Sequence, residues 1–258
     1  MINISSKELE VIRPFVYKDL VRIGNKGDGG YLIPERCIGE LEFCISFGIG
    51  YNHTFELDLQ RRAPKIKVIG FDHTVGLIYF FTKAINAAVK LCLLKGTFRD
   101  LRVRTNRFLN FFGFWSINSQ NRHKKIKITH ENISAILNEY KSYSTLLKID
   151  IEGTEWETLP LVARNLAFVK CLVLEFHFVD QNILSFKSIL KLLQENFYIA
   201  HTHINNYSNS NFKVMPDFLE ITFINKIFSN EPFKVKCLPN LKLDCKTMPF
   251  SEDFRIIF

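Results

Sequence analysis

The sequence predicts an α/β protein built on a mostly parallel sheet with helices on both faces. Short apolar segments rich in β-branched residues alternate with longer segments whose apolar residues recur at helical spacing. This alternation is typical of parallel strands joined by crossover helices. The apolar segment Leu146–Ile151 has two carboxylates at its end, Asp150 and Glu152. Because ligands bind at the carboxyl ends of strands in open α/β sheets, these acids mark the expected site.

Seven segments are predicted to be strands. In chain order they are Glu42–Gly48, Lys67–Phe71, Arg107–Phe114, Leu146–Ile151, Cys171–Phe176, Tyr198–Ile204 and Phe218–Asn225. The first strand ends in a Gly-x-Gly turn, and the second ends at Asp72. The last two strands are expected to form a final pair joined by a turn-rich loop.

Five segments are predicted to be helices, namely Phe55–Ala63, Leu77–Leu94, Ile133–Tyr140, Thr154–Leu166 and Ile183–Asn196. Thr154 stands three residues before Glu157, which is a capping-box signature for a helix start. Pro160 is expected to kink this helix. The segment Leu77–Leu94 is apolar, but Lys83 and Lys90 fall on one polar stripe with an asparagine, which favours an amphipathic helix over a membrane span.

The formal net charge of +8 is distributed unevenly. Eleven Lys or Arg and a single acid, Asp100, lie between Lys83 and Lys127, so this segment carries +10 and the rest of the chain sums to −2. Such a region attracts phosphates, nucleic acid or anionic lipid, unless it is only a solvated basic face. The six cysteines show no Cys-x-x-Cys pairing, and Met1–Lys18 lacks the apolar core of a signal peptide. A cytoplasmic protein without a zinc site is therefore expected.

Two strand ends predict a site for an adenosine-type cofactor. The first strand runs into Gly48-Ile49-Gly50, and such a turn lets the backbone approach a ligand closely. Asp72 follows after roughly 20 residues, where an acid holds ribose hydroxyls in dinucleotide-binding folds. The third glycine of the dinucleotide-binding fingerprint is missing, which argues against binding of a diphosphate. S-adenosylmethionine, an adenosine-type cofactor without a diphosphate, fits this pattern. The alternatives are a plain strand-to-helix turn and a solvated turn residue at Asp72.

Polar residues also follow the later strands. Asp150, Glu175, His177 and His203 could converge on one crevice, because the strand ends that carry them meet at one edge of the sheet. Carboxylates and imidazoles placed in this way bind a divalent metal or act as a general base. The alternative for each histidine is a hydrogen-bonded structural role.

Together these motifs resemble the FkbM-type methyltransferases and their close relatives over most of the chain. The matching segments are Gly24 with Asp28–Tyr31, Ser46–Gly50 with Phe55 and Glu56, Phe71–Thr74, Leu147–Glu155, Leu174–His177, His203–Asn206 and Pro216–Thr222. The Lys-Ile-Asp-Ile-Glu-Gly-x-Glu run from Lys148 to Glu155 is the more specific part of the resemblance, and the glycine turn alone is not specific.

The resemblance implies a Rossmann-like, seven-stranded class I methyltransferase sheet with helices on both faces, and methyl transfer from S-adenosylmethionine. It implies a set of cofactor-binding residues, namely Ser46, Gly48, Gly50, Glu56, Asp72, His73, Thr74, Trp115, Ser116 and Asp150. Trp115 and Ser116 follow the predicted third strand and are assigned to the adenine side. The residues expected on the substrate side are Asp28, Tyr31, Glu152, Asn205, Asn206 and Arg102.

Related O-methyltransferases often hold a divalent metal between acids at the fourth and fifth strand ends. The resemblance therefore implies Asp150, Glu175 and His177 as ligands for Mg or Mn. His177 or His203 is the expected catalytic base, with Asp150 and Glu175 orienting it or binding the metal. A sugar hydroxyl is a weak acid, so a base or a metal is needed to remove its proton.

Members of the resembled family commonly methylate sugars, and the basic segment favours an anion. The expected acceptor is therefore small and anionic, such as a nucleotide-linked hexose or heptose in surface polysaccharide or capsule biosynthesis. The alternatives are a nucleic-acid methyltransferase, an enzyme for a lipid-linked acceptor, and a protein that binds S-adenosylmethionine without catalysis. The usual amino-methylation run, Asn/Asp-Pro-Pro-aromatic, does not occur in the sequence, so no nucleic-acid partner is expected. Peripheral membrane association and a homodimer remain open.

The expected organisation has three parts. Residues 1–40 form an amino-terminal cap segment, residues 41–228 form the methyltransferase domain, and residues 229–258 form a carboxyl-terminal extension. The basic insertion occupies about residues 75–127 of the middle part.

Overall fold

The structure is a computed structural model that describes residues 1–4, 7–39, 41–116, 119–141, 144–166, 168–208, 212, 214–229 and 233–258. Small parts of the predicted cap, insertion and extension, namely residues 5, 6, 40, 117, 118 and 230–232, lie outside the described residues. The main sheet contains β4 (Phe43–Phe47), β5 (Lys67–Phe71), β6 (Arg122–Lys124), β7 (Thr145–Ile149), β8 (Val169–Phe176), β9 (Phe197–Ile204) and β10 (Leu219–Asn225).

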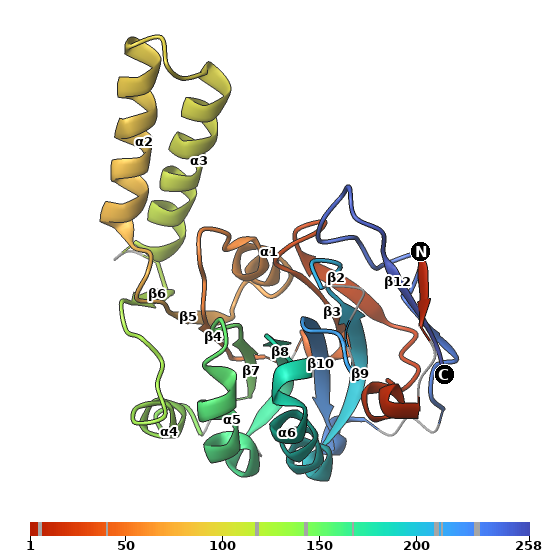
Figure 1. Cartoon of the computed structure of the whole chain (residues 1–258). Helices are drawn as coiled ribbons and strands as arrows, with labels where there is room; N and C mark the ends of the chain where they lie inside the picture. The colour runs from red at the N-terminus through yellow and green to blue at the C-terminus, as the bar shows by residue number, and fades with distance from the viewer. Residues whose placement is uncertain are drawn as a thin grey trace.

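These seven strands are ordered β6-β5-β4-β7-β8-β10-β9. The pairs from β6 to β8 are parallel, and β10 runs antiparallel to both of its neighbours. The helices are α1 (Thr54–Arg62), α2 (Leu77–Cys92), α3 (Phe98–Trp115), α4 (Ile133–Asn138), α5 (Glu155–Val162) and α6 (Ile183–Asn196). The predicted seven-stranded, mostly parallel sheet with helices on both faces is therefore confirmed (Figure 1).

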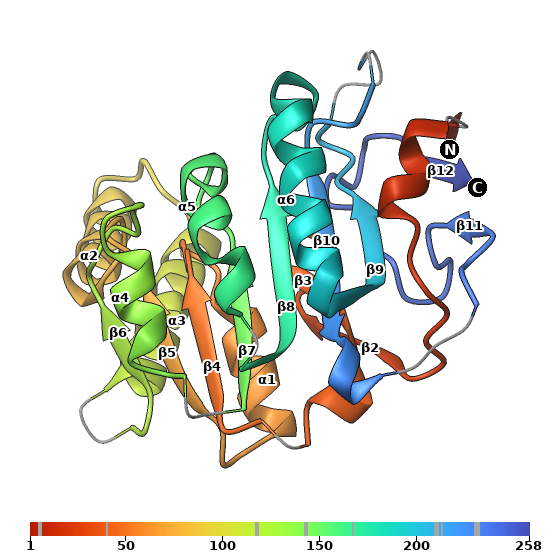
Figure 2. The ribbon, with the colours of Figure 1, turned by 90° about the horizontal axis from the view of Figure 1, so that it is seen from below.

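The two faces of the sheet have separate cores. On one face, α4, α5 and α6 lie across the strands (Figure 2). Their buried side chains, among them Leu137, Leu159 and Phe186, belong to one apolar cluster with Phe47 and Ile149 of the sheet. On the other face, α1 and the hairpin of β2 (Leu20–Gly24) and β3 (Gly30–Pro34) form a second cluster with the sheet. Strands buried on both faces read as continuous apolar runs, which is why most of them could be recognised in the sequence.

The prediction of a third strand at Arg107–Phe114 is wrong. These residues belong to α3, an 18-residue helix whose first turn is capped by Thr97, with its hydroxyl accepting a hydrogen bond from the Asp100 backbone N–H at 3.1 Å. The actual third strand is β6, three polar residues at the edge of the sheet. The whole insertion between β5 and β6 is consequently a helical hairpin, in which α2 and α3 pack against each other and stand away from the body (Figure 1).

The predicted capping box at Thr154 is also not formed. The Thr154 side chain makes no cap hydrogen bond, and Glu157 lies 3.8 Å from His130 at the surface. Glu155 turns back toward the strand instead and accepts a hydrogen bond from the Ile151 backbone N–H at 3.1 Å. Pro160 lies inside α5, which ends at Val162 and continues as a 3₁₀ turn.

The two ends of the chain lie side by side. β1 (Ile2–Ile4) pairs in parallel with β12 (Phe254–Ile257), and β12 pairs antiparallel with β11 (Cys237–Leu238). This small sheet packs onto the core through side chains such as Phe254 and Ile256 (Figure 1). Short 3₁₀ helices complete the described structure, namely η1 (Lys7–Ile12), η2 (Glu35–Cys37), η3 (Ala163–Asn165), η4 (Asp180–Asn182) and η5 (Lys226–Phe228). Within the described ranges, no helix combines the length and the apolar character needed to cross a membrane.

Candidate functional site

A cavity of about 400 Å³ opens at the carboxyl ends of β4, β5, β7 and β8. Its walls come from the ends of these strands and the turns that follow them, from the loop after β6, from the turn between residues 24 and 30 and from the start of α1. The lining residues that were predicted from the sequence are Asp28, Gly48, Gly50, Asp72, His73, Thr74, Asp150, Glu152 and Glu175. A cavity of this size, at this edge of an open α/β sheet, suits a small-molecule ligand.

Close packing of two strand ends fixes the glycine turn. Gly48 has a φ of +79°, and a Cβ at this position would lie 1.7 Å from the carbonyl oxygen of Asp150. Only glycine fits there, because any side chain would collide with the neighbouring backbone. The backbone hydrogen bonding between β4 and β7 continues past the end of β7, since the Asp150 N–H donates to the Phe47 carbonyl at 2.9 Å. The glycine turn after β4 and the acidic end of β7 are therefore in direct contact.

Asp72 organises the turn opposite it. One carboxylate oxygen accepts hydrogen bonds from the N–H groups of Ile49 and Gly50 at 2.9 and 2.7 Å. The other accepts from the Thr74 N–H and hydroxyl, both at 2.6 Å, and from the Val75 N–H at 3.3 Å. Burial raises the pKa of Asp72, but these hydrogen bonds lower it by more, so the group is a carboxylate. Asp72 thus joins the glycine turn to the next loop and still lines the cavity.

Lys148 is the buried cation of the site. Its ammonium group donates to the Gly48 carbonyl at 2.9 Å and lies 3.5 Å from an Asp150 carboxylate oxygen. Burial lowers the pKa of Lys148, but Asp150, Glu56 and Glu175 raise it above its ordinary value. The lysine stays charged and holds the glycine turn and Asp150 together.

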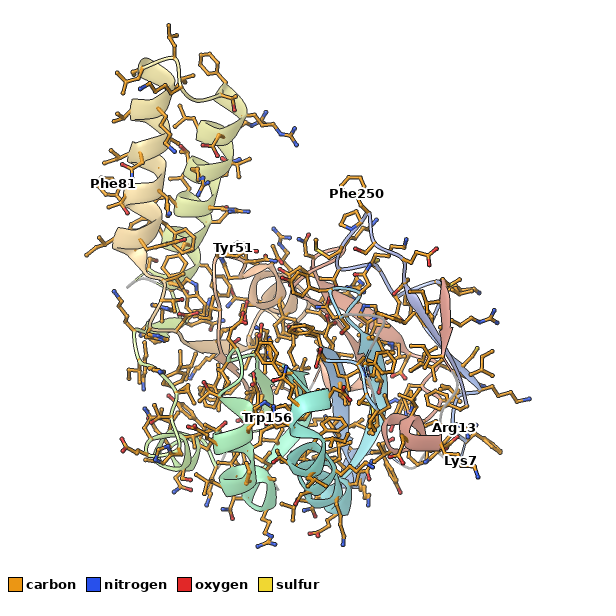
Figure 3. All side chains as sticks on the ribbon, in the orientation of Figure 1. Lys7, Arg13, Tyr51, Phe81, Trp156 and Phe250 are labelled. Carbon is orange, nitrogen blue, oxygen red and sulfur yellow. The ribbon has the colours of Figure 1, made fainter. Side chains whose placement is uncertain are left out.

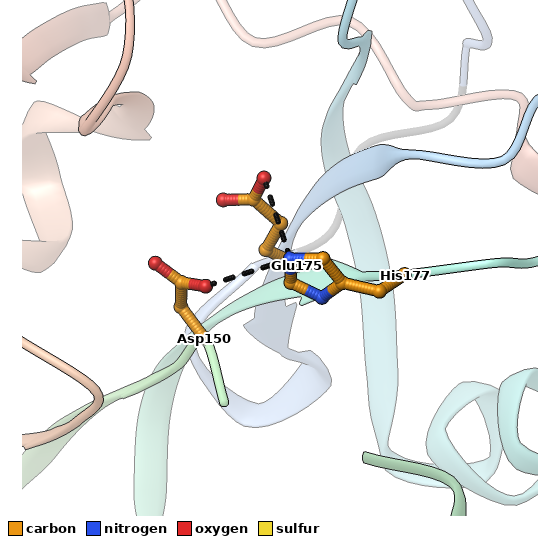
Figure 4. Close-up of side chains that lie close together, drawn as sticks. All are labelled: Asp150, Glu175 and His177. Atoms are coloured by element: carbon orange, nitrogen blue, oxygen red, sulfur yellow. Dashed lines mark ion pairs between the residues drawn. The ribbon is translucent and has the colours of Figure 1, made fainter. Parts of the chain in front are cut away.

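Asp150, Glu175 and His177 form a cluster (Figure 4), and Asp150 and Glu175 also line the cavity. One ligand atom from each residue can be chosen so that all three lie within 4.8 Å of one another. The His177 Nε2 atom lies 3.9 Å from Asp150 Oδ1 and 4.0 Å from Glu175 Oε1. Glu152 is more exposed, and one of its oxygens lies 3.5 Å from the same nitrogen. Both Glu152 and Phe178, which follows His177, have positive φ angles, of +55° and +58°.

Glu155 orients the imidazole, although sequence reasoning did not assign it to the site. Its carboxylate lies 3.0 Å from His177 Nδ1, and its side chain is fully buried. Burial lowers the pKa of His177, but Glu155, Asp150 and Glu152 raise it above its ordinary value. With Nδ1 held by Glu155, Nε2 is left to face Asp150 and Glu175. This carboxylate–imidazole pair is the usual arrangement behind a histidine that binds a metal or accepts a proton.

Glu175 is held from behind by two predicted residues. The Tyr31 hydroxyl donates to Glu175 Oε2 at 3.0 Å, and the Asn205 amide lies 3.5 Å from Oε1. Burial raises the pKa of Glu175 strongly, and the charges of Asp150 and Glu220 raise it further. A divalent cation fits this group, because the donor set of two carboxylates and one imidazole suits it and its charge would relieve their repulsion.

Other predicted residues lie outside the cavity. Ser46 and Glu56 are buried beneath the glycine turn, where the Ser46 hydroxyl donates to Glu56. The Asn206 amide donates to the Met248 carbonyl at 2.8 Å and so holds the carboxyl-terminal segment. Arg102 is exposed on α3 and does not line the cavity.

His203 does not reach the cavity either. It is buried on β9, and its Nδ1 lies 3.5 Å from Asp244 of the carboxyl-terminal segment, which also lies 3.1 Å from His201 Nε2. Burial lowers the pKa of His203, but Asp244 and Glu220 raise it to about 9. A histidine that is protonated at neutral pH and covered by its own chain is poorly placed to act as a base.

The two residues assigned to the adenine side do not line this cavity, because the third strand lies elsewhere than predicted. Trp115 is the last residue of α3 and Ser116 follows it, and neither residue lines the cavity. The residues that come after the actual third strand, Ile126, Lys127 and Ile128, line the cavity instead. Their position could be read from the sequence only if β6 had been recognised.

A second cavity, of about 230 Å³, lies at the base of the α2–α3 hairpin. Its lining residues are Tyr51, Tyr79, Phe80, Lys83, Arg104 and Arg107. It contains three cationic side chains and no acid, and it shares Tyr51 with the main cavity. The guanidinium group of Arg107 lies 5.2 Å from the centre of the Tyr51 ring, which places this arginine over the shared wall.

The family model described as "Methyltransferase FkbM domain" matches residues 45–200, which is more than half of the chain. The chain belongs to the FkbM methyltransferase family. The match spans the glycine turn, Asp72 and the Asp150–Glu175–His177 cluster, so the resemblance seen in the motifs is confirmed. Membership makes the protein an S-adenosylmethionine-dependent methyltransferase.

The chain is also similar to solved structures at low identity. A fibrillarin pre-rRNA processing protein from Methanococcus jannaschii is 12% identical, with 81% of this chain and 83% of that chain covered and a TM-score of 0.41. A precorrin-6y C5,15-methyltransferase from Geobacter metallireducens is 9% identical, with 74% and 84% covered and a TM-score of 0.38. The family assignment does not depend on these likenesses. A comparison with curated proteins gives no match.

Proposed function

We propose that this FkbM methyltransferase transfers the methyl group to a hydroxyl of a nucleotide-linked sugar, such as a hexose or heptose used for surface polysaccharide, in the cytoplasm. The observation that carries the proposal is the Asp150–Glu175–His177 cluster beside the cavity. An oxygen acceptor must lose a proton that a sugar hydroxyl holds tightly, and this cluster is the kind of group that removes it.

The cofactor would occupy the side of the cavity between the glycine turn and Asp72. Gly48 and Gly50 would line the methionine part, with open space where a Gly50 side chain would stand, and Ile126 and Ile128 offer apolar walls for the adenine. Bound S-adenosylmethionine supplies a methyl group on a positively charged sulfur. The tight contact between Gly48 and Asp150 supports this arrangement, because the acidic cluster would then lie next to that end of the cofactor. Holding two reactants in line in this way contributes as much as about 7–11 kcal/mol in favourable cases.

Asp150, Glu175 and His177 are the residues that would hold a divalent cation, which would supply positive charge to lower the pKa of the acceptor hydroxyl. Asp150 is placed to accept the hydrogen bond of that hydroxyl. Glu155 fixes the tautomer of His177, so that Nε2 faces the cavity side and accepts the proton when no cation is bound. The Lys148 ammonium group, 3.5 Å from Asp150, would hold that carboxylate in position.

The basic cavity supports an anionic acceptor. Lys83, Arg104 and Arg107 could bind a diphosphate there, while the sugar reaches past Tyr51 into the main cavity. Arginine is well suited to phosphate because its planar donors match the oxygens of the anion.

The direct test is incubation of the protein with S-adenosylmethionine and a panel of nucleotide-linked sugars, with and without chelator, read by mass spectrometry. A mass gain of one methyl group on a sugar hydroxyl supports the proposal. Loss of the product with chelator, and its recovery with Mg²⁺ or Mn²⁺, assigns the cation. Methylation of free nucleic acid in preference to every sugar would overturn the acceptor class.

The basic cavity is tested by an Arg104→Gln, Arg107→Gln variant. The KM for the nucleotide-linked acceptor should rise at least about tenfold, because two charge-assisted contacts to phosphate are lost. The matched control is Arg99→Gln with Arg102→Gln, which removes the same charge from the same helix without touching the cavity. An equal rise in KM for both variants would show that only the overall field of the helix matters.

A further inference from the structure

The α2–α3 hairpin exposes far more apolar surface than its own packing requires. In the described structure, α2 buries only Phe80 and Ala87, and α3 buries only Phe111 and Phe114. The hairpin projects from the body, with Phe81 on its outer side and Tyr51 near its base (Figure 3). Large exposed apolar patches bordered by polar residues mark sites of interaction with proteins or membranes.

The exposed apolar residues of α2 lie along one side of the helix. Ile78, Phe81, Ile85 and Val89 follow one another at spacings of three or four residues, and all are exposed. Residues at this spacing share a helix face. The face continues onto α3, because the ring of Phe81 lies 5.5 Å from that of Phe108. Phe108 in turn stacks with Phe112 at 6.3 Å, so both helices contribute to one apolar face.

The tip of the hairpin is apolar as well. Leu94 is 93% exposed with a φ of +56°, and its neighbours Leu93 and Phe98 are 61% and 79% exposed. Three large side chains therefore project from a turn where polar residues are usual. The tip continues the apolar face beyond the ends of the two helices.

The same hairpin is rich in basic residues. The hairpin from Leu77 to Ser116 contains seven Lys or Arg, namely Lys83, Lys90, Lys95, Arg99, Arg102, Arg104 and Arg107. Its single acid, Asp100, is paired with Arg104 at 3.1 Å. An apolar face bordered by unopposed cations is the composition of helices that lie in the interface of an anionic membrane.

We propose that the α2–α3 hairpin docks on an anionic lipid bilayer, with its apolar face and tip in the interface and its basic residues at the lipid phosphates. A second copy of the chain is a poorer occupant, because two such faces would bring cationic borders together. Nucleic acid would use the cations but would leave the apolar face and tip unexplained. The inference does not depend on the nature of the methyl acceptor.

Docking of this kind would also orient the catalytic domain. Leu77 begins α2 only five residues after Asp72, so the hairpin leaves the sheet at the edge where the cavity opens. A bilayer that binds the hairpin would therefore lie on the cavity side of the molecule.

The test is sedimentation of the whole protein with vesicles made of equal parts phosphatidylcholine and phosphatidylglycerol. The wild-type protein should sediment with these vesicles and remain in solution with phosphatidylcholine alone. Leu94→Glu with Phe98→Glu should weaken binding at least about tenfold, because the tip then carries negative charge. Lys90→Gln, Lys95→Gln and Arg99→Gln together should do the same through lost attraction to lipid phosphates.

The matched control is Leu184→Glu with Ile227→Glu, which changes two equally exposed apolar residues on the body. This variant should bind vesicles like the wild type. Circular dichroism melts of all variants check that each is folded.

Three outcomes would overturn the proposal. One is a wild-type protein that stays in solution with the anionic vesicles at low salt. Another is a control variant that loses binding as much as the tip variant does. The third is a wild-type dimer that the tip substitutions convert to a monomer, since a second copy would then cover the face.

Discussion

Two clusters of histidine and carboxylate in the described part of the chain differ in what surrounds them. In the Asp244 cluster, one carboxylate lies between two imidazoles, those of His201 and His203, and the side chains of all three residues are buried. In the His177 cluster, one imidazole lies within 4.0 Å of four carboxylates, and three of those residues line or border the cavity. In the first cluster the negative charge of Asp244 is balanced by the histidines beside it, whereas the second cluster has an excess of negative charge beside a ligand cavity.

The comparison shows that residue type alone does not mark a catalytic site. Burial raises the pKa of Asp244, but His201 and His203 lower it well below its usual range, so this group is a stable ion pair. Glu175 has the opposite shift, with a pKa raised by burial and by like charge. Carboxyl groups whose ionised form is disfavoured in this way are found at sites that a ligand or a cation completes.

The largest expected effect comes from Asp150→Asn. The turnover number should fall at least about a hundredfold, because the amide neither binds a cation well nor accepts a proton. The thermal midpoint should change little, since the side chain is partly exposed and remains able to contact Lys148. Methyl-transfer kinetics and a melting curve measure the two effects. Turnover within about threefold of the wild type would exclude a catalytic role.

Asp244→Asn should show the reverse pattern. Removing this charge leaves a protonated His203 buried without its partner, which typically costs about 3 kcal/mol of unfolding free energy. Urea unfolding measures the loss, and the turnover of the folded fraction should remain close to that of the wild type. If stability were unchanged and turnover fell, the two clusters would have exchanged the roles assigned to them.

Glu155→Gln should have a smaller effect on the His177 cluster. A carboxylate behind a ligating or proton-accepting histidine usually contributes about 10- to 100-fold to metal affinity or activity. Loss of its charge should also lower the pKa of His177, so the acidic limb of the pH–rate profile should move to lower pH. Glu157→Gln, two residues away and exposed, is the matched control and should leave the profile in place. A drop in activity without a shift of the limb would indicate a structural role only.

The smallest effect concerns pH and stability. The pKa of His203 is raised from 6.5 to about 9 in the folded protein. Its contribution is therefore fully present below the unfolded value and is lost as the pH rises toward the folded value. The free energy of unfolding should fall by on the order of 1 kcal/mol between pH 6.5 and about pH 8. In a His203→Gln variant the free energy of unfolding should fall less over this pH range. An equal fall in both proteins would show that His203 is not its source.

Most of the sheet could be predicted because its strands are buried on both faces. β5 and α6 match the predicted bounds, and β4, β7, β8, β9 and β10 differ from them by one or two residues at their ends. β6 could not be predicted, because Arg122–Lys124 is a short edge strand of polar residues with no apolar pattern. The aromatic run in Arg107–Phe114 was assigned to that strand instead, although Thr97 caps a helix that contains it.

The site could be predicted where it depends on strand ends. Asp150 follows β7, Glu175 lies near the end of β8 and His177 follows β8, and adjacent parallel strands bring such residues together. Glu155 could not be predicted, because the capping-box pattern that begins at Thr154 identifies Glu157 as the capping acid. Arg104 and Arg107 could not be assigned to a cavity, since their position depends on the hairpin that the strand prediction excluded.

The three left-handed backbone positions have a consequence for how this protein could be stabilised. Among the described non-glycine residues, positive φ angles occur at Leu94, Glu152 and Phe178. Each costs the folded state roughly 1–2 kcal/mol, and none lies in the interior of a helix or strand. Two of them flank the His177 cluster and the third is the hairpin tip. An engineer who relieved this strain with glycine would gain stability at the positions where the chain is expected to work, and would trade function for it.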